Sequence, residues 1–475
     1  MTQQAMPSTN PLDAFGDWTA RTERSWPEEA ITLAHREIID LVAVMVPGAV
    51  EPAARIAFET VKEWGTGPCN VVGQSTGLAA PWAALVNGTA GHALDFDDNF
   101  DPPKAHASTV LVPAIFAMAD EAGASGADAI DAYIVGLQIM GRTGQGVNPP
   151  HRNRGWHATA TMGTVGAAAA CARLLRLDAE ASARAISIST SMAAGFMSQF
   201  GSMTKPVHAG LAAKAGIMAA SLARNGLTAG RHTLDGPTGM NRLMVGPDYE
   251  ELRDAITEPQ HGQILRFETG HVGEPLLIIE HKFRVKRFAN CGSNHRAMDA
   301  ILHLKAEHGF TAEEVERVDV HAPRAQLNNV MFERPQAGLE GKFSIEYAMA
   351  LCLTQERITL ADFSDTAVQR PELQALFPRV HRHPIDKQEN VCPNTVEVTL
   401  KDGRTLSETR LMPLGSKAAP YPTSQYWEKF DSCVEGLLDI ERAAALRTAL
   451  EDLPQLADVR QITTCLPFTG HAKAA

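Results

Sequence analysis

Three carboxylates lie close together in the segment Asp95-Phe96-Asp97-Asp98, and a histidine, His106, follows eleven residues after Asp95. Carboxylates this close are not all comfortably ionised unless a cation or hydrogen-bond donors face them. The pattern therefore indicates a metal site, a helix cap or an acid/base centre. An Asp at a helix end followed by a turn explains part of it as well.

Two further segments place a basic side chain just before a run of small residues. His157 precedes ATATMGTVGAAAA, and Lys205 precedes Pro206 and His208 in TKPVHAGLAAKAG. Helix starts favour anions, so an imidazole or an ammonium group there suits a bound carboxylate. A lone histidine at such a place is more often structural, and for Lys205 a lysine that reaches solvent along its aliphatic chain is an equal alternative.

The segment HKFRVKRFANCGSNHRAMDA (281–300) concentrates positive charge in an otherwise acidic chain. Alternation along a strand would place Lys282, Arg284 and Lys286 on one face, where they could bind small carboxylates. A solvated strand face explains the same pattern. Cys291 is a possible nucleophile, but the sequence does not assemble a Cys-His-Asn set around it.

The elements that must position these residues change character along the chain. Residues 32–234 are rich in Ala and Gly at three- and four-residue intervals, which predicts closely packed buried helices over 36–46, 81–96, 106–123, 163–177 and 209–226. After about residue 275 the pattern becomes α+β, with strands expected in 274–288 and 315–323, and helices in 294–309 and 342–355. The segment 394–411 predicts a hairpin around Asp402-Gly403, and 424–453 predicts helix that folds back on the first domain.

Composition narrows the functional class. The 475 residues carry 43 Lys and Arg against 55 Asp and Glu, a net charge of −12, which disfavours binding to nucleic acid or to anionic membranes. Seven cysteines without CxxC spacing argue against a disulfide framework or a zinc knuckle. No signal peptide or long apolar span is evident, so we expect a cytoplasmic protein.

Five segments together resemble the MmgE/PrpD family: NGTAGHALDFDD (87–98), RGWHATATMGTVGAAAA (154–170), GSMTKPVHAGLAA (201–213), KRFANCGSNHRAMDA (286–300) and GKFSIEYAMA (341–350). Its members include 2-methylcitrate dehydratase, cis-aconitate decarboxylase and iminodisuccinate epimerase. The resemblance implies a mainly α fold with a large all-helical domain (1–273 and 412–475), a smaller α+β lid domain (274–411), and a homodimer without metal or cofactor.

In the decarboxylase members, the active site uses residues that correspond to Asp95, His106, His157, Lys205 and Lys286. Cys291 stands where some members have histidine, and it joins Tyr347, in the last of the five segments, as a candidate substrate contact beside the two lysines. Dehydratase members typically have His-Pro-Ser where this chain has His106-Ala107-Ser108, and this departure resembles the fungal-type decarboxylases.

The resulting hypothesis is a cofactor-independent lyase, a decarboxylase or dehydratase, that acts on a small di- or tricarboxylate such as cis-aconitate or 2-methylcitrate. Histidines would move protons and lysines would hold carboxylates, so the acidic chain must rely on local cations. The alternatives are an isomerase or epimerase acting on iminodisuccinate, and a non-catalytic helical binding protein. A metal-dependent hydrolyase that holds Mg²⁺ at Asp95, Asp97 and Asp98 is a weaker alternative.

Overall fold

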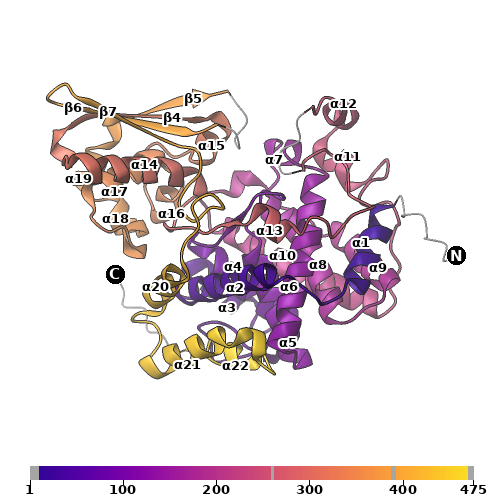
Figure 1. Cartoon of the computed structure of the whole chain (residues 1–475). Coiled ribbons are helices and arrows are strands. Elements are labelled where there is room, and N and C mark those ends of the chain that lie inside the picture. The colour runs from indigo at the N-terminus through magenta and orange to yellow at the C-terminus, as the bar shows by residue number, and fades with distance from the viewer. Residues whose placement is uncertain (1–9, 258–261, 387–391, 469–475) are drawn as a thin grey trace.

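The computed structural model describes residues 10–257, 262–386 and 392–468. A group of long helices fills the centre and right of Figure 1, and a small sheet with its own helices lies at the upper left. The structure is mainly α, as the sequence predicts. The division into a helical domain and a separate lid domain stays a prediction.

The central helices are built around small residues, and this is why they approach so closely. Their bounds are α2 (Glu28–Gly48), α4 (Ala80–Ala93), α5 (Ser108–Ala122), α6 (Gly126–Gln145), α8 (Ala158–Leu174) and α10 (Thr204–Arg224). Helix α10 packs against both α4 and α8. A Cβ on Gly210 would lie 2.1 Å from the carbonyl oxygen of Leu85, so glycine is required where α10 crosses α4. The helices predicted from small-residue spacing are confirmed.

Shorter helices surround this centre. Those in the first part of the chain are α1 (Pro11–Arg21), α3 (Pro52–Val61), α7 (Pro150–Asn153), α9 (Ala179–Thr190), α11 (Met240–Val245) and α12 (Tyr249–Asp254). Side-chain caps fix two of their starts: Asn10 accepts a hydrogen bond from the Leu12 amide in α1, and Asp178 accepts one from the Ala181 amide in α9.

The sheet has the strand order β5-β4-β6-β7, formed by β4 (Val315–Pro323), β5 (Val380–Ile385), β6 (Asn394–Leu400) and β7 (Thr405–Arg410). Strands β4 and β5 are parallel, and the other pairs are antiparallel. Alternate residues such as Val318, Val320 and Val396 are buried, and α14 (Gly292–His308) packs on the sheet. The predicted hairpin is confirmed, with Gly403 at φ +90° in its turn.

The remaining helices of this part are α15 (Arg324–Asn329), α16 (Gly338–Gly341), α17 (Ile345–Thr354), α18 (Asp365–Val368) and α19 (Pro371–Gln374). Helix α17 packs on α14, so both helices predicted for this region are confirmed.

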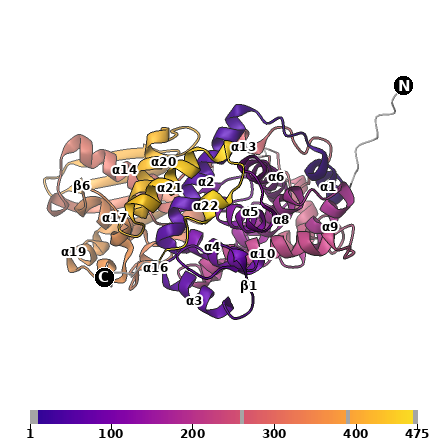
Figure 2. The same ribbon diagram turned by 90° about the horizontal axis from the view of Figure 1, so that it is seen from below.

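The end of the described chain returns to the first helices. Helix α20 (Thr423–Val434) packs on α2, and α21 (Ile440–Glu451) leads to α22 (Arg460–Thr463), which packs on α5 (Figure 2). An ion pair of 2.8 Å between Lys429 of α20 and Asp40 of α2 fixes this packing. The predicted helical return of 424–453 is confirmed, and it consists of α20 and α21.

The strand predicted over 274–288 is wrong for most of its length. Its apolar part forms the helix α13 (Leu277–His281), and only β3 (Phe283–Arg284) is a strand. Strand β3 pairs with β2 (Asn99–Phe100), with Phe283 opposite Phe100. This short pairing brings the segment that carries Lys286 next to the segment that carries Asp95.

Among the described residues, no single helix has both the length and the apolar character needed to cross a membrane. Helices α2 and α3 meet the criterion only as a pair bent by 83°, and most of α2 is buried in the core.

Candidate active site

A cavity of about 90 Å³ lies where the helical and α+β parts of the chain meet. Six of its lining residues are Lys or Arg, whereas Asp95 is the one carboxylate among those described. The cations come from elements far apart in sequence: Lys104, Arg152, Lys205, Arg284, Lys286 and Arg296. Phe100, Trp156, Phe200 and Phe343 add apolar walls. A cavity with this excess of positive charge suits a small polyanion.

Asp95 lies at the centre of the charged groups. It follows the end of α4 with φ +51°, a left-handed conformation that Asp tolerates better than most residues. Lys205, in the first turn of α10, donates to Asp95 Oδ1 at 2.6 Å. Lys286, just after β3, donates to the same oxygen at 3.0 Å and to the Asp95 carbonyl at 2.8 Å. The three side chains are almost completely buried.

This cluster has a net positive charge. Burial alone would raise the pKa of the Asp95 carboxyl, but Lys205 and Lys286 outweigh it and hold that pKa well below its usual range. One ionised carboxylate therefore faces two ammonium groups. The excess charge is available to a carboxylate of a ligand, which would enter next to Asp95.

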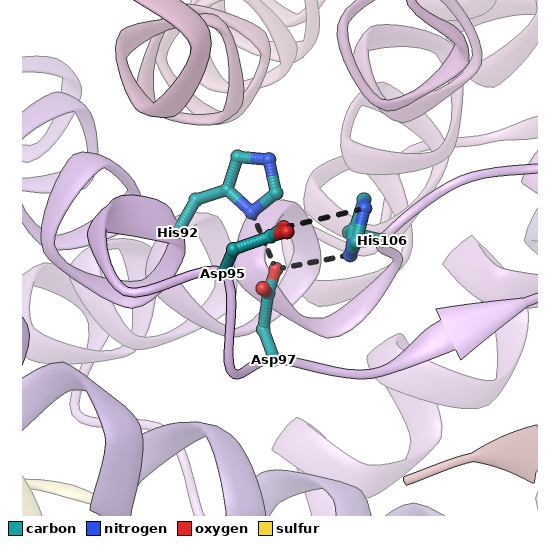
Figure 3. Close-up of side chains that lie close together, drawn as sticks. All are labelled: His92, Asp95, Asp97 and His106. Carbon is teal, nitrogen blue, oxygen red and sulfur yellow. Dashed lines mark hydrogen bonds and ion pairs between the residues drawn. The ribbon is translucent and has the colours of Figure 1, made fainter. Parts of the chain in front are cut away.

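His106 lies beside this cluster at the start of α5. Its Nδ1 is 2.7 Å from the carbonyl oxygen of Asp98, which can only accept, so Nδ1 carries the hydrogen. Its Nε2 lies 4.0 Å from Asp95 Oδ1 (Figure 3). Burial, followed by the charge of Lys286, outweighs the nearby Asp97 and places the pKa of His106 well below its usual value. The imidazole is therefore neutral at pH 7, with Nε2 as an available base.

His157 lines another part of the cavity and is the N-cap residue of α8. Its Nδ1 lies 3.0 Å from Nδ1 of His208 in α10, and its buried Nε2 has no partner among the residues that the structure describes. Burial and then the charge of Lys205 lower the pKa of His157 well below its ordinary value. Burial also lowers the pKa of His208, to about 4. Both rings are neutral near pH 7, and they share one hydrogen between the two Nδ1 atoms.

The geometry of the carboxylates bears on the metal hypothesis. Donor atoms of His92, Asp95, Asp97 and His106 all lie within 4.8 Å of one another (Figure 3). The Asp95 oxygen, however, already accepts from two ammonium groups, which would repel a divalent cation a few ångströms away. Burial raises the pKa of Asp98 to about 8, and its Oδ1 accepts from the Ser108 amide. This donor set therefore fits a metal ion poorly.

The structure brings most of the predicted site residues together. Asp95, His106, His157, Lys205 and Lys286 all line the one cavity. Cys291 lines it too, as the N-cap residue of α14, and burial raises the pKa of its thiol. Tyr347 lies elsewhere: it is fully buried, it is not part of the cavity lining, and its hydroxyl donates to the Asp362 carbonyl.

The predicted row of cations on one strand face is not formed. Lys282 pairs with Glu29 at 2.8 Å, Arg284 with Asp101 at 3.0 Å, and Lys286 with Asp95. Arg284 and Lys286 still reach the cavity, because β3 passes along its edge.

Sequence reasoning overlooked several side chains near the site. Lys104, Arg152 and Arg296 add charge to the cavity, and His92 packs behind His106. His92 stands three residues before Asp95 near the end of a predicted helix, so its position beside the carboxylates could have been noticed. The arginines gave no such signal, because only the tertiary fold brings them together.

The fold and the site together define a class of protein. It is a mainly α protein whose buried cavity combines acid/base side chains with cations. Residues 13–252 match the family model of the MmgE/PrpD N-terminal domain, and residues 288–455 match that of the MmgE/PrpD C-terminal domain. The chain therefore belongs to the MmgE/PrpD family, as the five sequence segments predicted.

Relatives in this family carry a specific name. The chain is 27% identical over 474 residues to cis-aconitate decarboxylase of Aspergillus terreus, covering 93% of this chain and 92% of that protein. It is 27% identical over 457 residues to cis-aconitate decarboxylase of Homo sapiens, with 92% and 90% covered. The Mus musculus protein of the same name is 28% identical over 408 residues, with 82% and 79% covered.

Proposed function

We propose that this protein is a lyase that decarboxylates cis-aconitate, or a closely similar tricarboxylate, without a cofactor. The observation that carries the proposal is the convergence of Lys205 and Lys286 on Asp95 beside His106, in a cavity lined by six cations. Relatives named cis-aconitate decarboxylase that align with over nine-tenths of the chain support it.

Binding comes first. The carboxylates of the substrate replace water around Lys205, Lys286 and the arginines of the cavity, and apolar walls such as Phe200 and Phe343 exclude solvent. Helices α8, α10 and α14 each begin at the cavity, so their partial positive charges favour the same anion. The binding energy comes from these cations and not from the chain as a whole, which carries a net charge of −12.

Decarboxylation breaks the bond between a carbon and one carboxylate. The electron pair stays on the substrate and spreads over the adjoining double bond and carboxylate, whose negative charge the lysines stabilise. A histidine then delivers a proton to carbon, and water restores that proton. The balance is one tricarboxylate trianion and one proton giving one unsaturated dicarboxylate dianion and CO₂.

Both candidate proton donors are histidines that are neutral while the site is empty. One of them must therefore gain a proton when the substrate binds. His106 and His157 both have pKa values lowered first by burial and then by nearby lysines. A bound trianion offsets the lysine charges, so the pKa of a neighbouring imidazole rises and the ring takes up a proton. The substrate thereby generates its own acid, and either ring can serve.

A panel of three substrates in D₂O, followed by NMR, tests the proposal. We expect cis-aconitate to give CO₂ and a five-carbon dicarboxylate with one deuterium on carbon. Loss of water from 2-methylcitrate would make the protein a dehydratase instead. Deuterium uptake with stereochemical change in iminodisuccinate would make it an epimerase. Binding of all three without turnover would favour the non-catalytic binding protein.

Matched variants connect any turnover to this cavity. Lys205→Met removes a cation of the site, whereas Lys214→Met removes one from the same helix at a place where its ammonium lies over the Trp82 ring. We expect only the first to lower kcat/KM, by about 10²–10³-fold. Loss of activity in EDTA that added Mg²⁺ restores would contradict the cofactor-independent proposal. The homodimer expected from the resemblance is tested separately by light scattering of the purified protein.

A further inference from the structure

A histidine and a carboxylate lie directly behind the candidate base His106, and the proposed reaction does not yet use them. His92 is in the last turn of α4, and Asp97 is in the loop that follows it. Both are buried to 99% or more, and neither belongs to the cavity lining. They cannot touch a substrate in the cavity, so any role must act through a neighbour.

Their contacts lead to His106. Asp97 Oδ2 lies 2.8 Å from Nδ1 of His92 and 3.5 Å from Nδ1 of His106, so one oxygen faces both rings (Figure 3). The centroids of the His92 and His106 rings are 4.5 Å apart. His92 also stacks on His157, with centroids 5.9 Å apart and planes inclined by 22°. His92 therefore lies between the two candidate acid/base residues.

Each residue of this pair also has a buried atom that is left unpaired. Among the described residues, the Nε2 of His92 and the Oδ1 of Asp97 are buried without a protein partner, as are some polar atoms elsewhere in the core. Leaving such atoms unpaired opposes folding, and a hydrophobic pair would fill the same volume without that cost. Stability alone therefore does not explain the two residues.

We propose that His92 and Asp97 form a positioning pair for His106: Asp97 supplies the negative charge that favours the protonated His106, and the Nδ1–H of His92 holds that carboxylate in place. This inference rests on the proposed function, because it concerns proton transfer at the same site. The geometry resembles that of a general base oriented by a carboxylate, with the Asp98 carbonyl fixing the tautomer.

The charges around His106 make Asp97 the decisive one. Burial of Asp97 is outweighed by His92 and His106, which hold the pKa of that carboxyl below its usual value, so it is ionised. Asp98, with a pKa of about 8, is mostly protonated at pH 7. The negative charge of Asp95 is neutralised by Lys205 and Lys286, which both donate to its Oδ1. Among the described residues, the titratable or charged groups that face His106 are His92, Asp95, Asp97, Asp98, His157, Lys205 and Lys286.

The test is the pH dependence of kcat/KM for cis-aconitate in Asp97→Asn. Removing a negative charge about 3.5 Å from His106 Nδ1 makes the ring harder to protonate. We therefore expect the limb of the profile that reports His106 to move to lower pH by about one unit or more. The control is Asp120→Asn, another buried carboxylate, which contacts Asn70 and Thr463 far from this site. It should change thermal stability without moving the limb.

Two variants of His92 separate the hydrogen bond from the ring stack. His92→Asn retains a side-chain N–H near the position of Nδ1, and we expect a profile close to the wild type. His92→Phe retains the ring and loses the donor, so its limb should move in the same direction as in Asp97→Asn. If Phe behaves as the wild type and Asn does not, the pair acts through packing and the proposal is overturned.

A readout without turnover keeps this proposal distinct from the proposed function. The ¹⁵N shifts of His106 are followed against pH with tricarballylate, a saturated tricarboxylate, in the site. We expect a hydrogen on Nδ1 in the wild type and a lower midpoint in Asp97→Asn, whatever the true substrate is. An unchanged midpoint in a folded Asp97→Asn protein overturns the positioning pair, even if decarboxylation is confirmed. The His92 variants give the same readout if Asp97→Asn does not fold.

Discussion

Two replacements in the Asp95 cluster should differ in their effects. We expect Lys205→Met to affect catalysis more than stability, and Asp95→Asn to cause the larger loss of stability. Lys205 Nζ and Lys286 Nζ lie 2.6 Å and 3.0 Å from the same Asp95 oxygen. At an effective dielectric constant of about 20, the shorter pair is worth about 6 kcal/mol, and two ammonium groups less than about 6 Å apart repel by about 3 kcal/mol or more. Lys205→Met removes attraction, repulsion and the desolvation of one ammonium together.

The net effect on folding is therefore small for Lys205→Met. Desolvation of a buried ion costs several kcal/mol, so we expect the free energy of unfolding to fall by about 2 kcal/mol or less. Asp95→Asn instead leaves two buried ammonium groups without a carboxylate, and should cost about 3–5 kcal/mol. The carboxylate, and not the lysine, is the residue on which the stability of the cluster depends.

For catalysis, we expect Lys205 to be the more sensitive position, although its replacement costs less stability than that of Asp95. Lys205 is placed to stabilise charge that develops on the substrate, so Lys205→Met should lower kcat/KM by about 10²–10³-fold. Asp95→Asn should tighten the binding of tricarballylate, because it raises the positive charge of the cavity. The assays are urea unfolding followed by fluorescence, initial rates with cis-aconitate, and calorimetry. A Lys205→Met protein that is less stable than Asp95→Asn would refute this electrostatic reasoning.

Three further predictions follow from buried groups. Burial and then Asp97 raise the pKa of Asp98 to about 8, so the folded state holds a proton that the unfolded chain releases above about pH 4. The stability from this proton is complete below that pH and is lost as the pH rises through about 8. In Asp98→Asn, the free energy of unfolding measured by urea at several pH values should fall less over this range. Binding of tricarballylate at pH 7 should be accompanied by proton uptake at His106 or His157. The binding heats measured in phosphate and in Tris should therefore differ, and identical heats would contradict this prediction. Gly210→Ala should cost about 2 kcal/mol or more and lower activity, because its Cβ meets α4; Leu211→Ala, exposed on the same helix, should do neither.

The helical centre was predictable because its signal is local. Small residues at helical spacing recur within single segments, and the same atoms that make the pattern, such as Gly210, also make the contact with α4. The hairpin at Asp402-Gly403 was predictable for the same reason, since its turn and both strands lie within one short segment.

The strand prediction for 274–288 was wrong because the composition of this segment is ambiguous. Leu277, Ile278 and Ile279 suit a buried strand as well as a buried helical turn, and periodicity does not separate the two over so short a run. Tertiary packing decides: α13 packs against α2 and α6, leaving only β3 extended. The face on which Lys282, Arg284 and Lys286 were predicted therefore does not exist, and each cation meets a different carboxylate.

Candidate residues were found where each had a local reason to be noticed, and missed where the reason lay elsewhere in the fold. Asp95 and His106 share one segment, and Lys205 opens a buried helix, so local context marks them. Asp97 was noticed only as a member of the carboxylate cluster, for which a metal site, a helix cap and an acid/base centre all remained open. Its contact with His92 forms across the turn that follows α4, where Asp95 has a left-handed conformation.

The acidic chain and the cationic cavity follow from one arrangement. A net charge of −12 is a sum over the whole chain, but salt screens charges beyond about 8 Å at physiological ionic strength, so a bound anion responds to its immediate neighbours. Those neighbours come from the loop before α5, from α7, α10 and α14, and from β3 and the residues after it, and they include six cations. Because these elements meet only in the folded chain, the net charge of the sequence carried no information about a small carboxylate. Affinity for the substrate should therefore depend on the packing of α10 against α4, which sets where Lys205 lies, more than on any surface charge.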